Sequence, residues 1–147
     1  MILGIRHTGI VVRDLNISLK FYRDLLGLSI WKSANEEGSF IEKVVGLSGV
    51  SLEWVKMRAP GGSLVELLQY HSHPDLQPLE KIPSNRLGCS HIAFTVDNLE
   101  EVYNLLCQHG YHCNSSPQIS PDGKAKVLYS YDPDGIIVEL VEEIKPA

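Results

Sequence analysis

The same succession of apolar and polar patterns occurs twice along the chain, once in each half. Each half opens with a short apolar segment, "HTGIVV" at 7–12 and "HIAFTV" at 91–96, which predicts a strand. A stretch with apolar residues at helical spacing follows in each half and predicts an amphipathic helix. These positions are Leu15, Leu19, Tyr22 and Leu26 in the first half, and Leu99, Val102, Leu105 and Leu106 in the second.

Polar residues just before each helical stretch provide candidate N-caps. Asp14 or Asn16 can cap the first helix, and Asp97 or Asn98 the second, because their side-chain oxygens can accept hydrogen bonds from the first free backbone N–H groups. We expect each helix to end at the glycine that follows it, Gly27 or Gly110.

Turn signals and further apolar segments complete each half. The stretch "PGGSLVELL" at 60–68 matches "PDGIIVELV" at 133–141, and each follows another strand candidate, "SLEWVKM" at 51–57 or "AKVLYSY" at 125–131. We therefore predict a strand, a helix and three strands in each half. An insert at 33–50, "SANEEGSFIEKVVGLSGV", separates two strands of the first half, and Phe40, Val44 and Leu47 could form one apolar helix face there.

The two halves match at two offsets, one for the first strand and helix and one for the last strands. His7 meets His91 at an offset of 91 − 7 = 84, and Glu66 meets Glu139 at 139 − 66 = 73. We predict an α+β fold, one domain over 1–147 made of two modules. The first module is expected at 1–71 and the second at 87–147, joined by a linker at 72–86 that is rich in proline and polar residues.

Composition excludes several classes of protein. The chain has 147 residues, 44% of them hydrophobic and 21% charged, which is typical of one globular domain. A net charge of −5 argues against nucleic acid as a partner. No apolar run approaches the roughly 20 residues that span a membrane. Three cysteines without a Cys-x-x-Cys pair, and an N-terminus unlike a signal peptide, favour the cytoplasm.

Glu66 and Glu139 stand inside apolar strands, where an unpaired carboxylate costs several kcal/mol. Each half also offers a histidine, His7 or His91, near the start of its first strand. The residue two positions later is small, Gly9 or Ala93, and leaves space on the same strand face. If the halves pack with related geometry, the two imidazoles and two carboxylates can converge on one divalent metal ion such as Zn, Ni, Co, Mn or Fe.

These segments resemble the vicinal oxygen chelate superfamily over nearly the whole chain. The resemblance rests on "HTGIVVRDLNISLKFYRDLLGL", "VELLQY", "SHIAFTVDNLEEVYNLL" and "YDPDGIIVELVE". It implies two βαβββ modules whose sheets form a curved, cup-shaped mixed sheet around one metal ion. It places the metal ligands at His7, Glu66, His91 and Glu139, and it implies a homodimer. Whether each metal site lies within one chain or is shared between two stays open.

The resemblance to glyoxalase I (lactoylglutathione lyase) and the methylmalonyl-CoA epimerases implies proton transfer next to a carbonyl of a small substrate. The metal would stabilise an enediolate, and Glu139 is the expected base, although the sequence does not separate it from its repeat mate Glu66, which stays the alternative catalytic residue. Bacterial glyoxalase I sequences carry Arg four residues after the first His and Asn four residues after the first Glu. Here these positions are Val11 and Tyr70, which argues against a glutathione conjugate as substrate.

Other functions are known on this fold, and the four ligand residues discriminate among them. Metal-free binding proteins of the bleomycin resistance type lack the ligand quartet. Extradiol dioxygenases and the thiol transferases that act on fosfomycin use two His and one Glu, so a fourth ligand at Glu66 would crowd their open positions. The insert at 33–50 could close the substrate pocket or simply cover a sheet edge.

Overall fold

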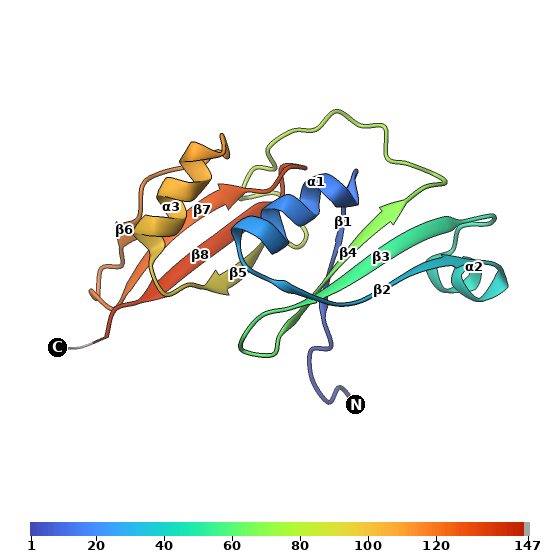
Figure 1. The fold of residues 1–147 in the computed structure, drawn as a ribbon, viewed down its shortest axis with the longest axis horizontal. Helices are drawn as coiled ribbons and strands as arrows, with labels where there is room; N and C mark the ends of the chain where they lie inside the picture. The colour runs from blue at the N-terminus through green and yellow to red at the C-terminus, as the bar shows by residue number, and fades with distance from the viewer. Residues whose placement is uncertain (146–147) are drawn as a thin grey trace. The chain divides into compact units, whose positions relative to one another are not determined.

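The computed structural model describes residues 1–145, and the chain separates into two compact units, Met1–Pro78 and Leu79–Ala147. Figure 1 labels the elements of both units. The first unit comprises β1 (Thr8–Val11), α1 (Leu15–Leu19), the π-helix η1 (Lys20–Leu25), β2 (Ser29–Glu37), α2 (Ser39–Val45), β3 (Ser51–Arg58) and β4 (Leu64–Tyr70). Its strands form an open sheet in the order β1-β4-β3-β2, with β1 parallel to β4 and the other pairs antiparallel.

The second unit repeats this plan. It comprises β5 (His91–Thr95), α3 (Leu99–Gln108), β6 (Gln118–Ile119), β7 (Ala125–Tyr131) and β8 (Ile137–Glu143). The sheet order is β5-β8-β7-β6, again with one parallel pair, β5 and β8. The predicted α+β fold class with two βαβββ modules is thus confirmed. Within residues 1–145, every helix is too short or too polar to cross a bilayer.

The N-termini of α1 and α3 are held in the same way. Asp14 Oδ1 accepts hydrogen bonds from the backbone N–H groups of residues 16 and 17, and Asn98 Oδ1 accepts one from residue 101, so one candidate cap from each predicted pair is used. A side chain from the last strand of the same unit adds a second tie. The Leu15 N–H donates to Gln69 Oε1 at 2.8 Å, and the Leu99 N–H donates to Glu142 Oε2 at 2.7 Å.

The first helix widens into a π-helical turn over η1. This turn inserts one residue into the 3.6-residue period, and as a result two consecutive residues, Phe21 and Tyr22, are both fully buried. Their rings meet edge to face, with centroids 5.0 Å apart. A strict helical spacing predicts only Tyr22 at the core.

Residues 33–37, which the sequence assigned to the insert, continue strand β2 instead. The rest of the insert forms α2, which packs on the sheet through one side. Ile41 joins Val50 and Leu52 in a small core, and Leu47 packs against that cluster as expected. Phe40 and Val44, the other two members of the expected apolar face, are largely exposed. Trp54 and Tyr70 also pack against this core, so α2 covers one end of the sheet face that carries them.

The segment between the sheets crosses the β7–β8 turn. The Ile82 N–H donates to the Gly135 carbonyl at 3.1 Å, and Gly135 has φ of 85°. A Cβ at Gly135 would lie 2.2 Å from the Glu80 carbonyl oxygen, so only glycine permits this close approach. The residues from Leu79 onward therefore pack as part of the second unit.

Candidate functional site

His7 and Glu66 lie side by side on one face of the first sheet. Gly9 is the register partner of Glu66 in the parallel pair β1–β4, so His7, two residues earlier, points to the same face. His7 Nε2 is 3.0 Å from Glu66 Oε2, and the Glu66 side chain is 11% exposed. A Cβ at Gly9 would already be 3.9 Å from that carboxylate oxygen, so the small residue keeps space open beside it.

His91 and Glu139 form the equivalent pair in the second unit. Ala93 is the register partner of Glu139, and His91 Nε2 is 2.9 Å from Glu139 Oε2. The other ring nitrogen, Nδ1, lies 2.6 Å from Ser90 Oγ and 3.5 Å from the Tyr129 hydroxyl. These contacts orient the imidazole and leave Nε2 directed at the carboxylate. In the first unit, His7 Nδ1 is buried and has no hydrogen-bond partner within residues 1–145.

The residues opposite the two glutamates break the symmetry of the repeat. Lys56 is the register partner of Glu66, and its Nζ lies 3.2 Å from Oε1, so both oxygens of that carboxylate are in contact with a side chain. Tyr129 is the register partner of Glu139. Burial raises the pKa of Tyr129, and the negative charge of Glu139 raises it further. In the described part of the chain, Glu139 is contacted through one oxygen, by His91, and its side chain is 21% exposed.

The donor atoms of both pairs fit a divalent metal ion. Two ligand atoms about 2.1 Å from an ion and 90° apart lie about 3.0 Å from each other. The Nε2–Oε2 separations of 3.0 and 2.9 Å match this spacing, and imidazole nitrogen with carboxylate oxygen suits a borderline divalent cation. The same distances also suit a charge-assisted hydrogen bond. Each pair thus offers one imidazole nitrogen and one carboxylate oxygen at a spacing that a divalent ion could accept.

The structure brings the four predicted residues together two by two, one pair in each unit. Within either unit, as far as residues 1–145 are described, no group of three or more His, Cys, Asp or Glu side chains is arranged to hold a metal ion.

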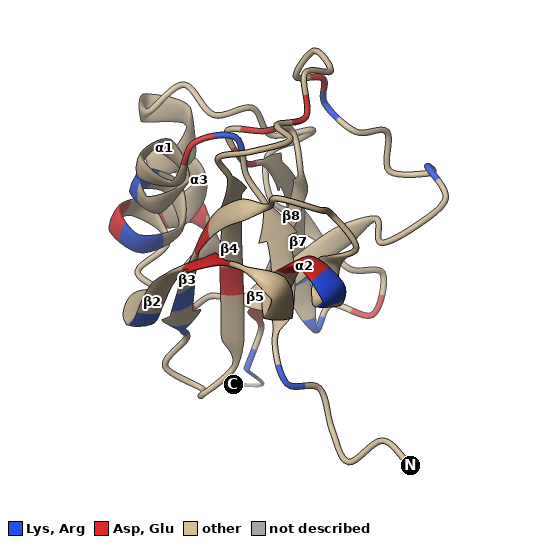
Figure 2. Cartoon of the chain, turned by 90° about the vertical axis from the view of Figure 1, so that its right-hand side faces the viewer, with Lys and Arg blue, Asp and Glu red and all other residues tan. Residues whose placement is uncertain are grey.

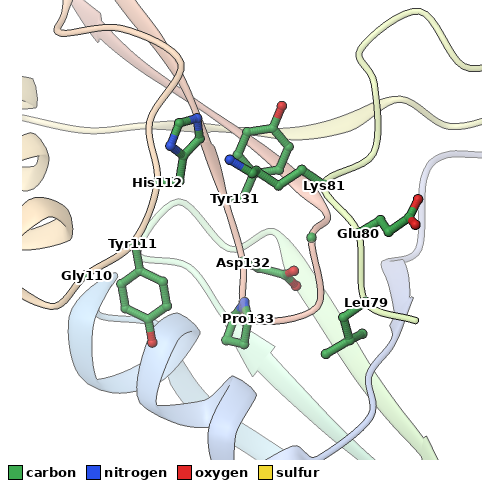
Figure 3. Close-up of a pocket in the computed structure, with 10 residues that line it drawn as sticks. Leu79, Glu80, Lys81, Gly110, Tyr111, His112, Tyr131, Asp132 and Pro133 are labelled. Carbon is green, nitrogen blue, oxygen red and sulfur yellow. The ribbon is translucent and has the colours of Figure 1, made fainter. Parts of the chain in front are cut away.

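A pocket of about 350 Å³ lies elsewhere in the second unit, at the β7–β8 turn. Figure 3 shows the Lys81 side chain alongside the Tyr131 ring, with His112 and Tyr111 nearby. Burial raises the pKa of Tyr111, and the Asp132 carboxylate raises it further. The lining does not include His91 or Glu139, so this hollow, formed where the linker crosses the hairpin, is distinct from the His–Glu pairs.

Sequence reasoning missed Lys56 as a neighbour of the site. The signal was present in the repeat, because the offset of 73 that relates Glu66 to Glu139 also relates Lys56 to Tyr129, since 56 + 73 = 129. Alternation along β3 then places Trp54 and Lys56 on the site face.

Comparison with known proteins finds relatives across the whole chain. The chain is 32% identical to a lactoylglutathione lyase of Schizosaccharomyces pombe over 97% of its own length, and it spans about half (49%) of that relative. It is 28% identical to a lactoylglutathione lyase of Escherichia coli O157:H7, over 93% of the chain and 90% of the relative.

Solved structures and the family pattern agree with these relatives. A crystal structure of a glyoxalase family protein from Bacillus cereus superposes with a TM-score of 0.89 and 27% identity, covering 99% of this chain and 97% of that one. The model of the Glyoxalase/Bleomycin resistance protein/Dioxygenase superfamily matches residues 4–140. With its repeated βαβββ modules and a His–Glu pair in each, the chain belongs to the glyoxalase/bleomycin resistance protein/dioxygenase superfamily.

Proposed function

We propose that the chain is a divalent-metal-dependent enzyme of the lyase or isomerase type, which moves a proton on the carbon next to a carbonyl group of a small substrate. The observation that carries this proposal is the equivalence of the two His–Glu pairs, with Nε2–Oε2 distances of 3.0 and 2.9 Å. Two relatives that carry the name lactoylglutathione lyase support the class of reaction.

His7, Glu66, His91 and Glu139 would hold the metal ion. When bound, a divalent ion supplies positive charge that stabilises negative charge developing on the substrate oxygen. The ion also offsets the cost of keeping two carboxylates in partly buried positions. The pairs would meet either within one chain or across two chains.

We assign the base to Glu139 rather than Glu66. Both oxygens of Glu66 are already in contact, one with His7 and one with Lys56, which holds the carboxylate in place as a ligand. Within residues 1–145, Glu139 pairs through one oxygen, with His91, and its side chain is more exposed than that of Glu66. In a substrate with a hydroxyl on the carbon next to the carbonyl, Glu139 would accept the proton from that carbon, and the electron pair left behind would form a C=C bond as the carbonyl pair moves onto its oxygen. Glu139 would return the proton to the former carbonyl carbon while the hydroxyl proton passes to the former carbonyl oxygen, so that carbonyl and hydroxyl exchange places.

The substrate we propose is a carbonyl compound other than a glutathione conjugate. Val11 is exposed on the site face, as the register partner of Leu68, and offers no charge to a carboxylate. Arg13, the nearest alternative cation along the chain, donates to the backbone carbonyls of Asp75 and Gln77 at 3.3 and 2.5 Å. Its guanidinium therefore ties down the segment after β4.

Metal binding is the first test. Protein stripped with chelator would be titrated with Ni, Co, Zn or Mn, and metal per chain and thermal stability measured. We expect one ion per chain and a stabilisation of about 2.7 kcal/mol at a hundredfold excess over Kd. His91→Ala and Glu66→Gln should abolish binding, whereas His109→Ala, on an exposed histidine, should not. No uptake of any of the four metals would refute the proposal.

Proton transfer is the second test. Metal-loaded protein would be incubated in D₂O with a panel of small α-hydroxy and α-oxo carbonyl compounds, and loss of the proton signal beside the carbonyl followed by NMR. Glu139→Gln should slow exchange at least about a hundredfold, as expected for loss of a general base. Glu143→Gln, on the exposed end of the same strand, is the control. Undiminished exchange in Glu139→Gln would rule out this base.

We also propose that the chain forms a homodimer, as the resemblance to this superfamily implies. Twofold pairing is the commonest way for a soluble protein to associate. Sedimentation equilibrium with and without metal should give twice the mass of 16.4 kDa. A monomer mass under both conditions would refute the dimer.

A further inference from the structure

A group of cations and tryptophans lies beside Glu66 on the site face of the first sheet. We call it the cationic face, and it consists of Lys32, Lys56 and Arg58 with Trp31 and Trp54. Lys32 is the register partner of Lys56 across the β2–β3 ladder, and Arg58 follows Lys56 by two residues, so these positions share one side of the sheet. Figure 2 shows blue segments on β2 and β3 and a red segment on the neighbouring strand β4.

The tryptophan rings hold the cations in place. Lys56 Nζ lies 4.5 Å from the Trp54 ring centroid, and the Lys56 side chain is only 18% exposed. Trp31 is contacted by two cations, with Lys32 Nζ at 4.7 Å and Arg58 Cζ at 4.8 Å from its centroid. A register shift between residues 30 and 32 of β2 allows Trp31 and Lys32 to meet in this way. Cation–π contacts of this kind fix the charged groups while leaving their N–H donors available.

The charges of the cationic face are not balanced by its own carboxylates. The face has three cations and two carboxylates, Glu66 and Glu36. Glu66 contacts Lys56, and Glu36 accepts a hydrogen bond from the Trp54 indole N–H. Like charges directly opposite each other across a strand pair are unfavourable, and Lys32 and Lys56 stand in that relation. An anion bound between them would relieve the repulsion.

The second unit lacks this feature. The offset of 73 takes Lys56 to Tyr129 and Arg58 to Tyr131, so aromatic rings replace the cations at the equivalent positions of β7. The repeat is retained at the His–Glu pairs and lost at the cations. This difference points to a ligand that is charged at one end.

We propose that the cationic face binds an oxyanion group, a carboxylate or a phosphonate, of the substrate whose carbonyl reacts at the neighbouring His–Glu residues. The inference rests on the proposed function for the carbonyl end of the substrate. It adds that the rest of the substrate carries a negative charge, so that the substrate is a small anionic carbonyl compound. Lys56 is the central contact, because it lies between Glu66 and the exposed Lys32. Its role is to position the substrate.

The test uses the fluorescence of the chain's two tryptophans, both of which belong to the cationic face. Metal-free protein at low ionic strength would be titrated with pyruvate, acetylphosphonate and the neutral ketone hydroxyacetone. We expect the two anions to change the fluorescence saturably, with affinity that falls as NaCl is added, and hydroxyacetone to have no effect. The tighter of the two anions identifies the group that is recognised.

Variants decide which side chain is responsible. Lys56→Met should weaken anion binding about tenfold, as expected for loss of a charged hydrogen-bond donor, and Lys56→Arg should restore most of it. Because Lys56→Met also removes a partner of Glu66, Lys32→Met provides a second measurement on an exposed side chain, with an expected loss of about threefold. Lys20→Met, on an exposed lysine of η1, should bind like the unaltered protein.

The results separate this inference from the proposed function. Saturable, lysine-dependent anion binding supports the cationic face even in a protein that takes up no metal. Hydroxyacetone binding as tight as pyruvate, no response to any probe, or unchanged affinity in both Lys56→Met and Lys32→Met would each overturn it, even if the protein binds metal and exchanges protons.

Discussion

Replacing Gly135 by alanine tests how the linker crosses the β7–β8 turn. The new Cβ would lie 2.2 Å from the Glu80 carbonyl oxygen and 3.3 Å from Lys81 Cα, so the linker would have to move away. Moving it breaks the Ile82 N–H to Gly135 carbonyl hydrogen bond, at a cost of about 1 kcal/mol. The positive φ of 85° costs an alanine about 1 kcal/mol more. We expect the free energy of unfolding to fall by about 2–3 kcal/mol in total.

The repeat provides a matched control at Gly62, since 135 − 73 = 62. Gly62 has a similar φ of 92°, but nothing lies within 4 Å of a Cβ built there. Gly62→Ala should therefore lose only about 1 kcal/mol, the conformational cost. The difference between the two variants, about 1 kcal/mol or more, measures the contact with the linker.

Urea unfolding at 25 °C gives the two free energies, and limited trypsin digestion reports on the linker itself. Cleavage after Lys81 should accelerate in Gly135→Ala and stay unchanged in Gly62→Ala, because only the first variant displaces residues 80–82. Equal destabilisation of the two variants together with equal cleavage rates would refute the packing of the linker on this turn.

Three further predictions follow from individual side chains. Ser18→Ala should raise the free energy of unfolding by about 1 kcal/mol in urea titration, because the buried Ser18 hydroxyl has no hydrogen-bond partner within residues 1–145. Burial raises the pKa of Cys113 to about 11, so iodoacetamide at pH 8 should alkylate the exposed Cys89 well before Cys113; equal rates by mass spectrometry would contradict this. The hydrogen bond from the Leu99 backbone N–H lowers the pKa of Glu142 below its ordinary 4.5. The ionised carboxylate therefore stabilises the fold at pH values above 4.5, and this stabilisation is lost as the pH falls through the lowered pKa. In Glu142→Gln, the free energy of unfolding should fall less steeply as the pH is lowered into the acid range.

The sequence predicted the repeated fold because local patterns determine its elements. Helical and alternating periods, caps and turn residues occur in the same order in both halves, and each pattern indicates a single helix, strand or turn. Two sequence offsets relate His7 to His91 and Glu66 to Glu139. In the structure each histidine contacts the glutamate of its own unit. The assignment of all four to one metal site stays a prediction.

Features that depend on contacts between elements could not be read from such patterns. The π-helical turn departs from the regular helical period and buries Phe21 beside Tyr22. The residue of α2 that joins the core, Ile41, packs with Val50 and Leu52 of the following segment and strand. Lys56 contacts Glu66 only because the β3–β4 register sets them opposite each other. Periodicity along one strand carries no information about that register.

The unequal surroundings of the two glutamates have a stereochemical consequence. A site with two free carboxylates can withdraw hydrogen with one and deliver it with the other, which inverts a chiral centre. In the proposed function Glu139 alone would do both, because Lys56 and His7 occupy both oxygens of Glu66. One group that takes and gives back the same hydrogen works on a single side of the planar intermediate, so the reaction should yield one enantiomer and suit a shift between adjacent carbons better than racemisation.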